Sequence, residues 1–268
     1  MIKKRILITG LLACAIAQQA SAQVIFSDDF ESGLGNWTTT GSSALTLDIT
    51  RSADPGTSSA YLNTSADRMH NNIIANNGGL ELGGHSTFTA YIYDEAGTAS
   101  RVFNEVRGYS GGTGLPDGGT VASGALAQLI AIGKYNTITV GSAWDATKYQ
   151  ARVVFGGAVG WFNLDGIGAP SRSVGWHRFD IERLADGTTL NFYVDSILSK
   201  TYTGATAVDW DTLVMGPGLG STLGDAWIDS ISLNVGAPIP VPEPSTVALG
   251  LLGGAGLAFG YIRRRAKK

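Results

Sequence analysis

Residues 176 to 195 read WHRFDIERLADGTTLNFYVD, and this stretch decides the fold. Apolar side chains occupy alternate positions in its two halves, namely Phe179 and Ile181, then Leu190, Phe192 and Val194. Alternation with a period of two is typical of β-strands that bury one face. The turn sequence Ala185-Asp186-Gly187-Thr188 lies between the two runs. We therefore expect 176–184 and 189–195 to pair as an antiparallel hairpin.

The same alternation recurs at 88–92 and at 231–235, and no long segment has helical periodicity. Glycine, serine and threonine are abundant between the alternating runs, and the glycine-rich region 108–124 is expected to be a long surface loop. Strands with one apolar face, joined by such turns, predict an all-β fold. The expected architecture is an antiparallel β-sandwich, or jelly roll, over residues 23–236.

The N-terminal 22 residues have the three parts of a secretory signal peptide. Lys3, Lys4 and Arg5 form a basic head, an apolar run covers 6–17, and Ala20-Ser21-Ala22 provides small residues before a cleavage site. We expect a signal helix over 1–22 and a mature chain that begins at Gln23. The chain's one cysteine, at position 14, lies inside this signal, so the mature domain is expected to form no disulfide.

The charge distribution argues against nucleic acid as a partner. The whole chain has a formal net charge of −3, but 11 basic and 21 acidic residues lie between positions 23 and 242, which gives that region a net charge of −10. Such a domain repels phosphate backbones.

The C-terminal 32 residues differ in composition from the rest. Prolines alternate through 237–244, which predicts an extended linker, and 245–262 is free of charge and about long enough to cross a bilayer as one helix. The basic residues of 263–268 follow at once and are expected to stay in the cytoplasm. Two outcomes are open for this tail: a permanent anchor in the inner membrane, or a signal that is cleaved off.

These residues resemble a known sorting signal. The run Val241, Pro242, Glu243, Pro244 and Ser245, the apolar span, and Arg263, Arg264 and Arg265 together resemble the PEP-CTERM signal of Gram-negative bacteria that make exopolysaccharide. The resemblance implies recognition of the Pro-Glu-Pro element by an exosortase-type sorting enzyme. It also implies an exported, inner-membrane-anchored precursor that is then delivered to the cell surface or extracellular matrix.

The domain itself resembles concanavalin A-like and laminin-G-like jelly rolls. The hairpin of 176–195, the opening run 28–33 and the closing run 227–233 have the sequence character of strands in such domains. Galactose-binding-type jelly rolls begin and end in a similar way, so this alternative stays open.

Catalytic patterns are weak in this sequence. The E-x-D-x-x-E signature of concanavalin-like glycosidases and the G-x-S-x-G nucleophile motif are both absent. Asp180 and Glu182 share one face of a predicted strand, and we interpret them as solvated carboxylates on its polar side. His177 falls on the apolar side and is interpreted as a hydrogen-bonded histidine at the edge of the core. The prediction is a protein that is not an enzyme; a secreted glycosidase-like enzyme is the alternative.

Two binding sites are candidates. Asp28, Asp29, Asp225 and Asp229 would come together if the first and last strands pair, and could hold a structural calcium ion, the single cofactor the sequence suggests. Ordinary turn and strand-edge aspartates are the alternative interpretation. Trp161, with Asn163 and Asp165, suits a glycan-binding platform, although tryptophans in large sandwiches more often pack in the core. The overall prediction is a lectin-like surface protein for adhesion or for binding glycan and matrix.

Overall fold

The computed structural model describes residues 23–40, 45–53, 56, 58–62, 68–73, 84–95, 101–109, 126–135, 147–154, 160–205, 209–216 and 225–236. The predicted signal segment 1–22 and the tail 237–268 lie outside these residues, and so does 110–124 of the predicted loop. Within the described residues, no helix is both long and apolar enough to cross a membrane.

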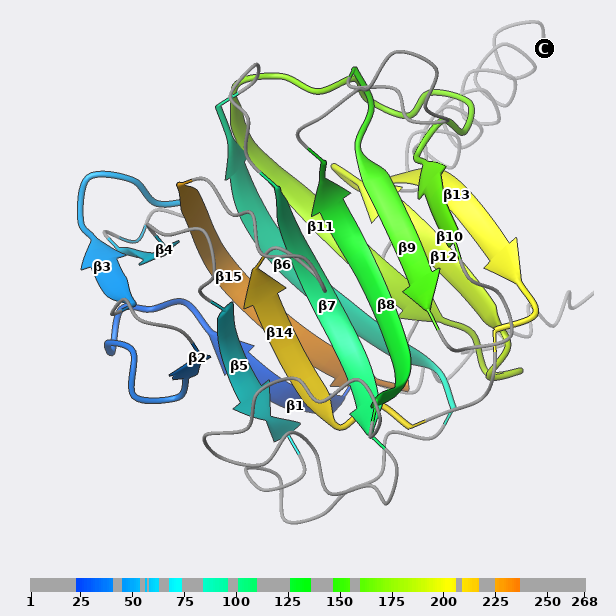
Figure 1. Cartoon of the computed structure of the whole chain (residues 1–268), viewed down its shortest axis with the longest axis horizontal. Helices are drawn as coiled ribbons and strands as arrows, with labels where there is room; N and C mark the ends of the chain where they lie inside the picture. The colour runs from blue at the N-terminus through cyan, green and yellow to red at the C-terminus, as the bar shows by residue number, and fades with distance from the viewer. Residues whose placement is uncertain are drawn as a thin grey trace, which may run out of the picture.

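The described strands form two antiparallel sheets, which are stacked one over the other in Figure 1. The eight-stranded sheet has the order β13-β12-β11-β6-β15-β4-β3, with β1 also paired to β15. Its strands are β1 (Gln23–Asp28), β3 (Thr46–Asp48), β4 (Ser59–Leu62), β6 (Ser86–Asp94), β11 (Gly175–Arg183), β12 (Thr189–Val194), β13 (Ile197–Thr203) and β15 (Ala226–Val235).

The seven-stranded sheet has the order β10-β9-β8-β7-β14-β5-β2. Its strands are β2 (Thr38–Thr40), β5 (Arg68–Asn72), β7 (Val102–Tyr109), β8 (Leu126–Lys134), β9 (Gln150–Val154), β10 (Gly160–Asn163) and β14 (Thr212–Gly216). The two sheets make the antiparallel sandwich that the sequence predicts.

The predicted hairpin is confirmed as β11 and β12, with Phe179 opposite Val194 and Ile181 opposite Phe192. Asp186 stabilises the turn because its Oδ1 accepts hydrogen bonds from the backbone N–H groups of Thr188 and Thr189, each at 2.8 Å. Gly187 has a φ of +71°, a conformation that glycine adopts without steric cost.

The main core lies between the sheets and takes one alternating set of side chains from each strand. Phe88 and Ile92 of β6, Phe179 and Ile181 of β11, and Leu233 of β15 are all buried in it. Each fully buried side chain of this kind contributes about 1.5–3 kcal/mol to stability. The apolar phase read from the sequence is therefore the phase that faces the opposite sheet.

Candidate functional site: the outer face of the seven-stranded sheet

The strand register brings one row of side chains across six strands of the seven-stranded sheet. Residues that pair on neighbouring strands point to the same face of a sheet. Taken from β5 to β10, the row is His70, Val214, Glu105, Ala131, Arg152 and Trp161.

This row faces away from the main core. Its chain neighbours Val106, Ile130, Val153 and Phe162 pack in the core between the sheets. Side chains next to them in a strand must point outward. The outer face has an apolar cluster of its own, to which Phe103, Tyr109, Leu129 and Val154 belong, with Tyr135 and Trp161 packed against it.

Glu105 and Arg107 form a buried ion pair at the centre of this outer face. Neither side chain is exposed, and Glu105 Oε2 accepts hydrogen bonds from Arg107 Nε at 2.7 Å and Nη2 at 2.5 Å. Burial would lower the pKa of Arg107, but the charge of Glu105 and the contact with Tyr109 raise it overall. The other carboxylate oxygen, Glu105 Oε1, is buried and has no hydrogen-bond partner in the described part of the chain.

An aromatic and cationic group borders the ion pair at β9 and β10. The Trp161 ring is half-exposed and lies 4.7 Å from the Phe103 ring and 5.3 Å from the Tyr135 ring, centroid to centroid. The guanidinium carbon of Arg152 is 4.8 Å from the Trp161 centroid, and that of Arg101 is 5.7 Å from it. Two half-exposed guanidinium groups therefore lie against one indole ring.

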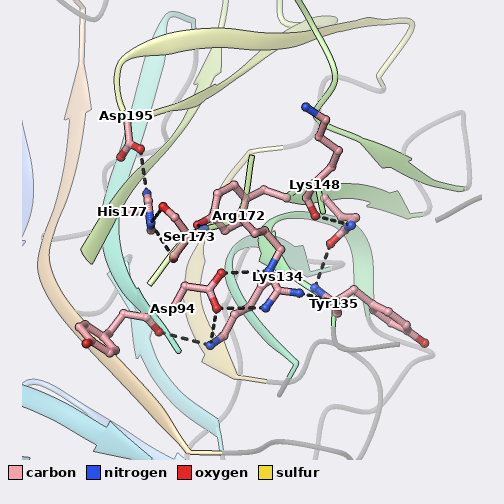
Figure 2. A network of polar contacts seen from close by, with 11 residues as sticks. Asp94, Lys134, Tyr135, Lys148, Arg172, Ser173, His177 and Asp195 are labelled. Carbon is pink, nitrogen blue, oxygen red and sulfur yellow. Dashed lines mark hydrogen bonds and ion pairs between the residues drawn. The ribbon is translucent and has the colours of Figure 1, made fainter. Parts of the chain in front are cut away.

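Figure 2 shows the polar network that holds Tyr135 in place. Asp94 of β6 accepts hydrogen bonds from Arg172 Nε at 2.9 Å and Nη2 at 3.0 Å, and from Lys134 Nζ of β8 at 3.4 Å. Arg172 Nη1 in turn donates to the Tyr135 carbonyl at 3.3 Å, and the Tyr135 N–H donates to Gln150 Oε1 at 2.9 Å. The network joins the two sheets and fixes the backbone that presents the Tyr135 ring to Trp161.

His177, Ser173 and Asp195 form a second part of Figure 2. His177 Nδ1 is 2.8 Å from Asp195 Oδ2, and Nε2 is 3.1 Å from Ser173 Oγ. The order resembles a nucleophile, base and acid, but Nε2 is also 3.0 Å from the Ser173 carbonyl oxygen. An imidazolium that donates on both sides satisfies this geometry, because a carbonyl oxygen only accepts. The prediction of a hydrogen-bonded histidine at the edge of the core is confirmed.

The stability of the protein is expected to depend on pH through His177. Burial alone would lower the pKa of this imidazole, but Asp195, the Ser173 carbonyl and Asp94 together raise it above the ordinary value of 6.5. The His177 contribution is then fully present below pH 6.5 and is lost as the pH rises through the raised pKa. Urea unfolding of the wild type and of His177→Gln should show a stability difference that shrinks between mildly acidic and alkaline pH. A difference that grows with pH would contradict this assignment.

The interpretation of Asp180 and Glu182 as solvated carboxylates is wrong. Asp180 is 0 % and Glu182 3 % exposed, because β11 lies between β6 and β12 and both neighbours supply donors. Asp180 accepts from Thr89 Oγ1 at 2.5 Å, and Glu182 contacts His85 Nε2 at 2.8 Å. Burial raises the pKa of Asp180. Burial would also raise the pKa of Glu182, but hydrogen bonds from Asn191, His85 and Tyr193 lower it overall.

The four predicted calcium ligands are not gathered into one ligand set. The first and last strands do pair, with Asp28 opposite Ile231, and a surface cleft of about 330 Å³ at this junction includes Asp28 and Asp29. Asp28 is occupied, since it accepts from the Phe30 N–H and from Trp37 Nε1, both at 2.8 Å. Asp229 accepts instead from the Ala53 N–H at 2.6 Å. No group of three His, Cys, Asp or Glu side chains that could hold a metal ion occurs among the described residues.

The three predicted glycan-binding residues are divided between two places. Trp161 and Asn163 lie two residues apart on β10 and so face outward together. Asp165 lies beyond the strand, is exposed, and pairs with Lys200 of β13 at 2.9 Å. Glu105, Arg107 and Arg152 were not among the site residues predicted from the sequence. The alternation of Glu105 and Arg107 with Val106 was a usable signal for the first two.

Comparison with protein families identifies the sorting signal at the C-terminus. Residues 240–265 match the PEP-CTERM protein-sorting motif. The chain is therefore an exported protein of the exosortase-sorted, cell-surface class, as its tail predicts. No curated protein matches the chain.

Several solved structures have a fold similar to that of the domain. The fold is similar to that of a carbohydrate esterase from the Shiga toxin-encoding bacteriophage phi24B, with a TM-score of 0.52, 15% identity and coverage of 81% of this chain and all of the other. Domain 4 of the arabinanase AbnA from Geobacillus stearothermophilus gives a TM-score of 0.48 and 14% identity, over 82% of this chain and 95% of that one. The cellulose-induced protein Cip1 gives 0.49 and 16%, over 78% and 96%. At these identities the likeness concerns the fold alone.

Proposed function

We propose that the domain is a non-enzymatic glycan-binding module that the sorting signal delivers to the cell surface, and that it binds through the outer face of the seven-stranded sheet. The observation that carries this proposal is the half-exposed Trp161 ring beside Arg101 and Arg152. Aromatic rings stack on the apolar faces of sugars, while carboxylate and guanidinium groups hydrogen-bond to sugar hydroxyls.

The accessible part of this face lies at β9 and β10. Ala131 and Glu105, on the strands further in, are 1 % and 0 % exposed, whereas Arg152 and Trp161 are half-exposed. A sugar ring would therefore stack on the Trp161 indole and reach the guanidinium groups beside it. The phage protein with a similar fold is itself a carbohydrate esterase, so this fold occurs in a protein that acts on carbohydrate.

Trp161→Ala is expected to weaken binding to polysaccharide by about tenfold or more, because the mutation removes a stacking surface worth roughly 1.5 kcal/mol. Trp176→Ala is the matched control, since Trp176 lies on β11 of the other sheet, in edge contact with Tyr93. Affinity electrophoresis of the full-length protein in gels that contain polysaccharide measures both variants. Equal losses in the two variants would contradict the proposed face.

A secreted glycan-active enzyme is the alternative function. Asp180 and Glu182 share one strand, and their pKa values are shifted in opposite directions, as is common for a catalytic acid and its partner. Both carboxylates are nevertheless buried beneath their hydrogen-bond donors. A reducing-end assay on the same polysaccharides, with Asp180→Asn and Glu182→Gln, tests this alternative. Product formation by the wild type that is lost in either variant would replace binding with catalysis.

A further inference from the structure

The outer face of the seven-stranded sheet holds more positive charge than its own carboxylates balance. Arg68, Arg101, Arg107 and Arg152 interact electrostatically with one another or with Glu105, and a second carboxylate, Asp211, lies beyond Tyr109. Asp211 is already engaged, since its Oδ2 accepts from the Tyr109 N–H at 2.7 Å and its Oδ1 from Thr212 Oγ1 at 2.8 Å.

This excess contrasts with most of the described domain, although Arg183 also lies over an aromatic ring, that of Trp210. Five cations elsewhere have a carboxylate within 3.4 Å, and they are Arg51, Lys134, Arg172, Arg178 and Lys200. Arg101 and Arg152 contact aromatic rings instead of a carboxylate. Each also has a buried Nε without a hydrogen-bond partner in the described residues. Among the described residues, therefore, no carboxylate is in ion-pair contact with either of these guanidinium groups.

The position is costly for the free protein. Burial lowers the pKa of Arg152, and the neighbouring charge of Arg101 lowers it further, while Glu105 opposes both. Burial also lowers the pKa of Arg68. A charge whose ionised form is disfavoured in the folded protein gains most from an anion that arrives with a ligand.

We propose that the glycan bound at this face is an acidic polysaccharide, whose anionic groups lie between Arg101 and Arg152 beside the Trp161 ring. Guanidinium groups bind planar carboxylates through two parallel hydrogen bonds, and the half-exposed side chains of Arg101 and Arg152 present their terminal N–H donors for that geometry. The inference rests on the proposed glycan binding and specifies the class of glycan.

The first experiment separates this inference from the proposed function. Full-length protein is tested against polygalacturonate, its carboxyl-reduced neutral product, alginate, dextran sulfate, dextran and arabinan. Binding to the acidic polymers should exceed binding to the neutral ones by about tenfold, and should fall on the order of tenfold in high salt. Equal binding to polygalacturonate and its reduced product would overturn the acidic specificity and leave glycan binding intact. Binding to none of the six would overturn both. Preference for dextran sulfate over the uronates would assign the site to sulfate esters rather than carboxylates.

A second experiment distinguishes ligand binding from a structural role of the arginine. Arg152→Gln should lower affinity for the acidic polymer about tenfold and affinity for a neutral polymer much less, because the glutamine amide still donates hydrogen bonds but carries no charge. Its melting temperature should stay equal to that of the wild type or rise, because a disfavoured charge is removed. Lys200→Gln is the matched control: it removes one charge from β13 of the other sheet and should bind as the wild type does. A lower melting temperature with unchanged affinity for the acidic polymer would overturn the proposal.

Discussion

Replacing Glu105 with alanine is expected to lower the free energy of unfolding by about 3–5 kcal/mol, because the mutation leaves the Arg107 guanidinium buried without its partner. Both side chains are fully buried, and Glu105 Oε2 receives two hydrogen bonds from Arg107. Arginine keeps its charge in proteins, so water must replace the acceptor that Glu105 supplied. Urea denaturation followed by tryptophan fluorescence measures the loss.

The double variant Glu105→Leu with Arg107→Met provides the control for this prediction. Replacing both partners of a buried pair by apolar residues is often neutral or stabilising, so the double variant should recover most of what the single variant loses. A single variant that loses less than about 1 kcal/mol would show that Arg107 is solvated and that the pair is not buried.

Replacing Phe179 with alanine is expected to cost about 3–5 kcal/mol, because the mutation leaves a cavity in the main core. Phe179 is 1 % exposed, pairs with Ala90 and Val194 on its two sides, and lies 5.0 Å from the Tyr149 ring in edge contact. The cost should therefore include lost aromatic contact as well as lost burial. Thermal and urea denaturation measure it.

Ile167→Ala is the comparison for the core variant. Ile167 lies on a loop and is fully exposed, so its truncation should change stability by about 0.5 kcal/mol or less. If Phe179→Ala behaved like Ile167→Ala, the main core would not extend to this part of β11.

The hairpin and the sandwich were predictable because both depend on local patterns. Phe179 is the fifth residue of β11 and Phe192 the fourth of β12, and a glycine turn joins the two strands, so their side of the sheet follows from counting along the chain. Pairing of the first and last strands followed from the resemblance to jelly rolls. The side of β11 predicted for Asp180 was also correct, since its side chain points away from the main core.

The solvent exposure of Asp180 was not predictable in the same way. Alternation tells which side of a sheet a residue faces and gives no information on what covers that side. Thr89 lies 91 residues before Asp180, and this contact requires the finished sheet, whereas the contact with Arg178 is local to β11. The candidate site shows the same limit. Glu105, Ala131, Arg152 and Trp161 are brought together by the register of four strands, and single-sequence patterns do not contain that register.

The position of β15 bears on how the domain withstands pulling. Tension on a surface-tethered binding domain enters through the strand nearest the tether, and here β15 ends at Val235, just before the sorting tail. β15 is an interior strand that is hydrogen-bonded to β6 on one side and to β4 and then β1 on the other. Because ladder hydrogen bonds run across the strand, a force along β15 loads them in shear, so that many must break at once. An edge strand would peel away one bond after another. This arrangement suits the proposed binding of a matrix polymer, because β15 resists tension while the polymer is held.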